Sequence, residues 1–101
     1  MIKIYPYGKR EITRKSLAKI WNLFPEEDIC MCITNRDLDQ FYKAKRIAYY
    51  YLNRGKDFSV EIDPTKLQFE VEWLLRIGVR KFYFPWIGLR EKLLFYSSTT
   101  L

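Results

Sequence analysis

Residues 29–33, Ile-Cys-Met-Cys-Ile, are a short run of apolar side chains between Asp28 and Thr34. An apolar run of this length with polar residues at both ends is typical of a β-strand buried on both faces, as central strands are. A long amphipathic segment follows at about residues 37–53, which we expect to be a helix ending at Gly55. A buried strand followed by a long helix predicts an α/β fold.

The segments on either side of this unit continue the alternation of strands and helices. Thr13 is placed to cap a helix that runs to about Phe24 and ends at Pro25. Short runs of alternating or mostly apolar residues predict further strands. Besides residues 29–33, the expected strands are residues 2–5, 58–62, 79–84 and 93–96.

The stretch from residue 64 to residue 77 fits two kinds of secondary structure. Asp63 and Pro64 resemble the cap and first residue of a helix that ends at Gly78, and we favour this interpretation. The same stretch alternates apolar and polar side chains from Leu67 to Trp73, as a strand does. If residues 64–77 form a helix, we expect a small single-domain α/β sandwich over residues 1–101, with four to five strands in a partly parallel sheet and two to three helices. If they form a strand, we expect an α+β fold with a C-terminal antiparallel meander.

The chain has 101 residues, the length of one domain, and it contains no histidine. Catalytic triads and dyads that use an imidazole base are therefore excluded, as are histidine-ligated metal sites. The two cysteines, Cys30 and Cys32, are too close in sequence for an unstrained disulfide and too few for a zinc site. We expect two buried, inert thiols and no cofactor.

Hydropathy gives an expectation about location. No apolar run approaches the roughly 20 residues that a membrane-spanning helix needs. Residues 1–5 lack the apolar core of a signal peptide. We therefore expect a cytoplasmic protein without a membrane partner.

Positive charge is concentrated near the N-terminus. The net charge is +6, and residues 1–19 contain six lysines and arginines but a single acidic residue, Glu11. A basic segment of this kind binds polyanions or acidic proteins, or serves only to keep a helix face solvated. The candidate polyanion-binding residues are Lys9, Arg10, Arg14, Lys15 and Lys19.

A second candidate surface lies on the helix expected at residues 37–53, on an arc away from its apolar face. Tyrosine and arginine are enriched where proteins bind one another, and the same mixture suits phosphates and exposed bases. The alternative is that the tyrosine rings pack against neighbouring loops and leave only their hydroxyls in water. The candidate partner-binding residues are Tyr42, Lys43, Arg46, Tyr49 and Tyr50.

Asp37 and Asp39 stand at the start of this helix, directly after the predicted central strand. Two carboxylates at that position could bind Mg²⁺. The order of strand, Asp-Leu-Asp, helix, strand and Asp63-Pro64 resembles a Toprim-type nucleotidyl-transfer domain over about residues 29–78. The resemblance implies an Mg²⁺-dependent nucleic-acid enzyme. Both aspartates are also explained as favourable charges at a helix N-terminus.

The chain departs from the Toprim pattern at two places. Toprim domains have a glutamate after an earlier strand, where this chain offers only Glu11. They also have small residues after the second aspartate, where this chain has Gln40, Phe41 and Tyr42. We therefore expect no catalytic residues and treat Asp37 and Asp39 as weak metal candidates.

Size and residue bias favour one class of function. A short, basic, motif-poor chain rich in Ile, Lys, Tyr and Phe is typical of phage or mobile-element accessory proteins, anti-CRISPR inhibitors among them. We expect a non-enzymatic binding protein that inhibits a host nucleic-acid-handling complex. The alternatives are a direct DNA- or RNA-binding protein and a Toprim-like enzyme.

Overall fold

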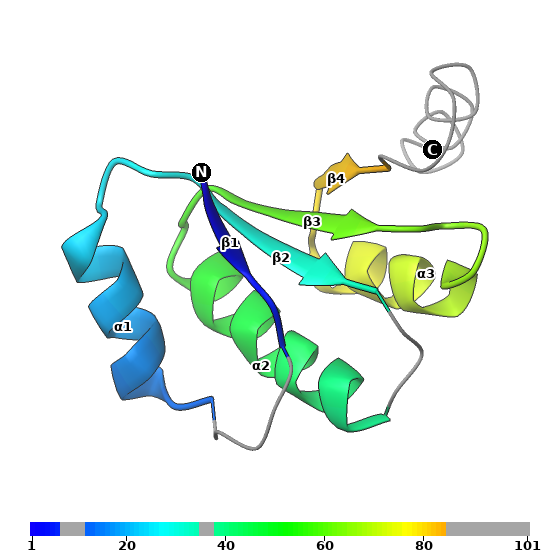
Figure 1. Cartoon of the computed structure of the whole chain (residues 1–101), viewed down its shortest axis with the longest axis horizontal. Helices are drawn as coiled ribbons and strands as arrows, with labels where there is room; N and C mark the ends of the chain where they lie inside the picture. Colours follow the sequence, from blue (N-terminus) through cyan, green and yellow to red (C-terminus); the bar gives the residue numbers. More distant parts are fainter. Residues whose placement is uncertain (7–11, 35–37, 85–101) are drawn as a thin grey trace.

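The computed structural model describes residues 1–6, 12–34 and 38–84, and in these residues four strands alternate with three helices (Figure 1). The sheet order is β1-β2-β3-β4, and each neighbouring pair of strands is parallel. The α/β class is thereby confirmed. In chain order the elements are β1 (Ile2–Ile4), α1 (Arg14–Leu23), β2 (Ile29–Ile33), α2 (Leu38–Asn53), β3 (Phe58–Ile62), α3 (Gln68–Ile77) and β4 (Lys81–Tyr83).

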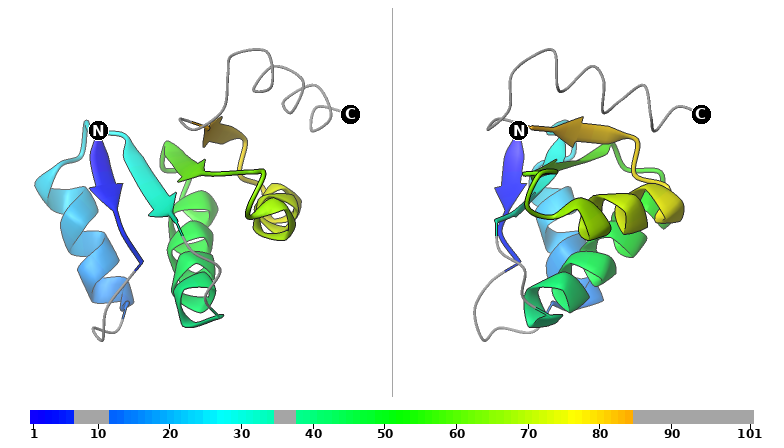
Figure 2. Two further views of the ribbon diagram at one scale, coloured as in Figure 1. Left: turned by 45° about the vertical axis from the view of Figure 1, so that its right-hand side comes forward. Right: turned by 90° about the vertical axis from the view of Figure 1, so that its right-hand side faces the viewer.

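The three helices lie on one side of the sheet, so the described residues form two layers (Figure 2). The strand order advances in one direction, and parallel crossovers share one hand, so successive helices return over the same face. In the described residues, no helix combines the length and the apolar character needed to cross a membrane.

Residues 64–77 decide between the two predicted folds, and they contain helix α3. It joins two parallel strands, β3 and β4, so the predicted antiparallel meander is wrong for this part of the chain. The expected cap is also wrong, because α3 begins after Leu67 and not at Asp63. The Asp63 carboxylate instead accepts hydrogen bonds from the backbone N–H and the hydroxyl of Thr65, at 3.0 and 2.6 Å, and shapes the turn before the helix. The strand expected at residues 93–96 lies outside the described residues.

Strand β2 is the centre of the sheet, as the apolar run predicted. All five of its residues are buried, and it pairs with β1 on one side and β3 on the other. Ile29, Met31 and Ile33 belong to the main core beneath the helices. Because successive strand residues point to opposite faces, Cys30 and Cys32 lie on the face of the sheet opposite the three described helices.

Helix α1 begins where the sequence predicts. Thr13 caps it through a reciprocal pair of contacts with Ser16, in which each residue's side chain meets the other's backbone N–H. Leu17 is buried beneath the helix, but Phe24, the expected end of the helix, is 46% exposed. Phe24 follows the last residue of α1 and has left helical geometry, so it no longer continues the helix face.

Tyr51 connects α1, α2 and β3 in the interior. Its side chain is fully buried, and its hydroxyl donates a hydrogen bond to the carbonyl of Leu17 at 2.9 Å. Its ring stacks on Phe58 at 5.8 Å between centroids and meets the edge of Trp21 at 6.3 Å. Burial raises the pKa of the Tyr51 phenol to about 12. The hydroxyl therefore stays protonated and can donate across the whole neutral range.

Small side chains lie at the centre of the sheet face opposite the three described helices. Cys30, Cys32 and Ser59 are buried there. Lys3 on β1 reaches across to Glu61 on β3, with 3.5 Å between Nζ and Oε1. The expected buried, unpaired thiols are confirmed. Burial, with a hydrogen bond to Glu61, raises the pKa of the Cys32 thiol to about 12.

The Tyr51–Leu17 hydrogen bond gives a stability prediction. We expect Tyr51→Phe to lower the free energy of unfolding by about 1 kcal/mol, because the ring contacts remain while one buried hydrogen bond is lost. Urea denaturation followed by circular dichroism measures this loss. Tyr42→Phe is the matched control, since Tyr42 is on the same helix and 70% exposed. Equal midpoints for the two variants would contradict the role given to Tyr51.

The two thiols give a reactivity prediction. In the folded protein at pH 8 we expect neither Cys30 nor Cys32 to react with Ellman's reagent within minutes, because both are buried and the Cys32 thiolate is disfavoured by its raised pKa. In guanidinium both should react at once. Rapid reaction of one thiol in the folded protein would contradict this expectation, because it would show that the reagent reaches the sheet face that carries Cys30 and Cys32.

Candidate functional site

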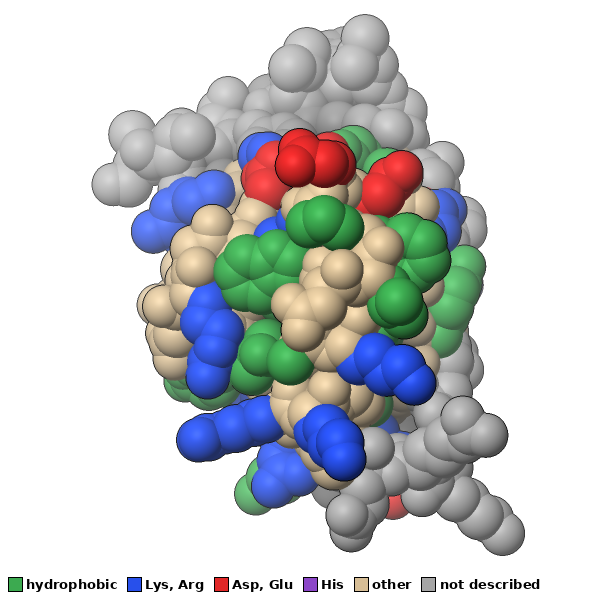
Figure 3. Space-filling view, turned by 90° about the vertical axis from the view of Figure 1, so that its left-hand side faces the viewer, with side chains coloured by type: hydrophobic (Ala, Val, Ile, Leu, Met, Phe, Trp, Pro, Cys, Tyr) green, Lys and Arg blue, Asp and Glu red, His purple; other side chains and the backbone are tan. Residues whose placement is uncertain are grey.

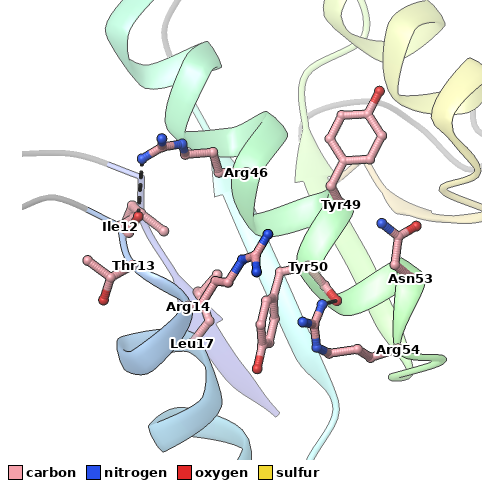
Figure 4. A pocket seen from close by; sticks show the side chains of 9 residues that line it. All are labelled: Ile12, Thr13, Arg14, Leu17, Arg46, Tyr49, Tyr50, Asn53 and Arg54. Carbon is pink, nitrogen blue, oxygen red and sulfur yellow. Dashed lines mark hydrogen bonds between the residues drawn. The ribbon is translucent and has the colours of Figure 1, made fainter.

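A groove of about 460 Å³ lies between α1 and α2, and it is the candidate site (Figure 4). We call it the α1–α2 groove. The residues before and at the start of α1 form one wall, and the exposed face of the second half of α2 forms the other. Its lining residues are Ile12, Thr13, Arg14, Leu17, Arg46, Tyr49, Tyr50, Asn53 and Arg54.

Helix geometry explains how α2 supplies its wall. Arg46, Tyr50 and Arg54 follow one another at intervals of four residues, and Tyr49 and Asn53 fill the same arc. Residues with this spacing lie above one another on a single helix face. The opposite face of α2 carries the buried Ala44, Ala48 and Tyr51. The groove wall is therefore the solvent side of a helix whose other side is packed on the sheet.

Two of the three arginines are held by contacts within the groove. Arg46 donates a hydrogen bond from Nη1 to the carbonyl of Ile12 at 3.4 Å, across the groove. Arg54 donates from Nη1 to the Tyr50 carbonyl at 3.2 Å, and its guanidinium carbon lies 3.9 Å from the centroid of the Tyr50 ring. Backbone carbonyls and a ring face hold these guanidinium groups without neutralising their charge.

Arg14 supplies the third guanidinium, from the first residue of α1. It is exposed, and within the described part of the chain it forms no hydrogen bond or ion pair. Figure 4 shows the side chains of Arg14 and Arg54 on different sides of the Tyr50 ring. Of these two guanidinium groups, that of Arg54 lies over the Tyr50 ring.

Among the residues that the structure describes, no aspartate or glutamate lines the groove. The space-filling view from the α1 side shows lysine and arginine side chains around the lower part of this face and acidic side chains gathered at its upper edge (Figure 3). The described lining thus brings three guanidinium groups to one cavity, an arrangement that favours a positive potential inside it. Such a potential concentrates anions, and the low-dielectric walls strengthen the effect.

The structure brings the two predicted surfaces together in part. Arg14 from the basic N-terminal group lines the same groove as Arg46, Tyr49 and Tyr50 from the long helix. Lys15 and Lys19 are exposed on α1 but do not line it. Lys9 and Arg10 lie outside the described residues. The described lining of the groove therefore includes residues from both predicted surfaces but neither surface in full.

Two residues of the predicted partner surface lie elsewhere. Tyr42 does not line the groove and takes part in a cluster between α2 and α3, where the Lys45 ammonium lies 5.4 Å from its ring centroid and 4.6 Å from that of Trp73. Lys43 is half-buried and does not line the groove. Tyr49 links the two regions, because its ring meets the edge of Trp73 at 5.9 Å.

Sequence reasoning missed five of the lining residues. Arg54 and Asn53 could have been found, since they extend the arc of Arg46 and Tyr50 by one helical turn. The other wall depends on how α1 packs beside α2, which no local pattern specifies. Its missed residues are Ile12, Thr13 and Leu17.

The Asp37 and Asp39 pair remains a weak metal candidate. Asp39 is exposed in the first turn of α2, and Asp37 lies outside the described residues. Within residues 1–6, 12–34 and 38–84, no three acidic or cysteine side chains gather in an arrangement that could hold a metal ion.

Comparison of the chain with models of known protein families, with curated proteins and with solved structures gave no match. The α1–α2 groove is therefore interpreted from its own chemistry: its described lining includes three arginines, two tyrosines and an asparagine.

Proposed function

We propose that the protein is a non-enzymatic binding protein that holds an anionic partner in the α1–α2 groove. The observation that carries this proposal is the convergence of Arg14, Arg46 and Arg54 on one cavity whose described lining includes no carboxylate. Guanidinium groups form paired hydrogen bonds with carboxylates and phosphates. The groove thus offers directed donors as well as charge.

The proposal agrees with the role expected from size and residue bias. A phage or mobile-element protein that blocks a host nucleic-acid-handling complex needs a surface that recognises either an acidic region of that complex or the nucleic acid it carries. The α1–α2 groove suits an anionic ligand from either source. The tyrosines add apolar contact area at low entropic cost, as in many binding surfaces.

A charge-matched pair of variants tests the proposal. In the groove variant, Arg14, Arg46 and Arg54 are each replaced by Gln. In the control variant, the exposed residues Lys66, Arg76 and Arg80 are replaced by Gln. Both lose three positive charges. We expect the groove variant to elute from immobilised heparin at clearly lower salt than the control, because charges that act on one site together contribute more than dispersed ones.

Circular dichroism and thermal unfolding check that both variants remain folded. Equal elution of the two variants would overturn the proposal, because polyanion binding would then depend on net charge alone. A pull-down from host extract, with and without nuclease, extends the test to natural partners. Retention by the wild type and the control, but not by the groove variant, supports the proposal, and equal retention by all three contradicts it.

A further inference from the structure

We infer that the anionic partner of the α1–α2 groove is a single strand of nucleic acid, with one base stacked on Tyr50 and neighbouring backbone phosphates bound by the arginines. This inference rests on the proposed function, since it names the ligand of the same groove. It depends on three features: the spread of the arginines, the setting of the Tyr50 ring and the concave shape of the site.

The spread of the arginines favours a chain with repeated charges over a ligand with one charge. Arg46 lies on α2 and Arg54 directly follows its last residue, eight positions further on, which corresponds to about 12 Å along the helix axis. Their side chains also diverge, because Arg46 reaches the Ile12 carbonyl while Arg54 lies against Tyr50 (Figure 4). One phosphate group is too small to contact both guanidinium groups in these positions. A strand that carries a phosphate at every nucleotide can supply a separate one to each.

The setting of Tyr50 favours a nucleobase. The Arg54 guanidinium lies over the ring at 3.9 Å, and Tyr51 meets it nearly perpendicularly, with 5.3 Å between centroids. These contacts fix the orientation of the ring before a ligand arrives, so binding costs little side-chain entropy. An aromatic ring fixed among cations is the arrangement that single-strand binders use, with bases stacking on the ring and cations on the backbone. The aspartate and glutamate side chains of an acidic peptide offer carboxylates to the arginines but no aromatic face to the ring.

The shape of the site favours a single strand over a duplex. The groove is a cavity of about 460 Å³ between two helices, and its arginines and Tyr50 line that cavity. In a duplex the bases are stacked inside and the phosphates lie on a wide cylinder, so no base can reach Tyr50 without leaving the stack. A single strand presents unstacked bases together with its phosphates.

Fluorescence anisotropy with labelled ligands at low salt tests the inference. The ligands are a 12-nucleotide oligothymidylate, a 12-base-pair duplex and a polyglutamate peptide. We expect the wild type to bind the single strand at least tenfold more tightly than either of the others. We expect Tyr50→Leu to weaken single-strand binding roughly tenfold or more, in line with the loss of one base–ring stack.

The arginine and tyrosine variants should differ in their response to salt. Arg46→Gln should make the slope of log affinity against log salt shallower by about 0.7, the value for one lost phosphate contact on a single strand. Tyr50→Leu should leave the slope unchanged, because it removes no charge. Tyr42→Leu and Arg76→Gln are the matched controls, since both residues are exposed and neither lines the groove. We expect both to bind like the wild type.

The possible failures are distinguishable. Binding of polyglutamate or duplex as tightly as oligothymidylate, with loss in Arg46→Gln but none in Tyr50→Leu, would overturn the single-strand inference and leave the anion-binding groove in place. Absence of binding to all three ligands would also overturn the inference, and the heparin comparison would then decide the proposed function separately. Equal weakening by the groove and control substitutions would overturn both.

Discussion

The buried hydrogen bond from the Tyr51 hydroxyl to the Leu17 carbonyl is the constraint on which the site depends. Helices α1 and α2 are separated in sequence by strand β2, and each packs on the sheet through its own apolar residues. Side-chain packing alone allows a helix to slide on a sheet, whereas a buried polar group left without a partner costs about 1–3 kcal/mol. The bond therefore fixes α1 at one position beside α2, and the α1–α2 groove is the space that this position leaves.

The parallel sheet has a second consequence for the site. Because all three crossovers return over the same face, α2 has a helix on each side, and its solvent face is bordered by α1 and α3. The two borders differ in chemistry. Towards α3, the single cation Lys45 lies over the rings of Phe41 and Trp73. Towards α1, three arginines line one cavity together with Tyr50. Of the two borders, the one towards α1 therefore brings more guanidinium donors together in the described residues.

The sequence allowed the α/β class, the buried central strand, the Thr13 cap and the preferred helix at residues 64–77 to be predicted, because each has a local signature. It misplaced the start of α3, since Asp63 satisfied the pattern of a helix cap while its carboxylate was taken by Thr65 two residues later. Backbone geometry decides whether such a carboxylate accepts hydrogen bonds within a turn or caps the following helix. For the site, the α2 wall follows from helical spacing, whereas the pairing of Arg14 with that wall depends on the tertiary contact made by Tyr51.

Stability alone does not explain the composition of the groove. The stack of Arg54 on Tyr50 is exposed and contributes only about 0.5–1 kcal/mol. The Arg46 hydrogen bond is long, at 3.4 Å, and also exposed, so it contributes little. Against these gains stands the mutual repulsion of three cations around one cavity, which is strongest at low salt. Replacing any of them by a neutral residue would relieve that repulsion. An arrangement that gains so little for the fold, yet holds two of its guanidinium groups in place, is what the proposed binding of an anion requires.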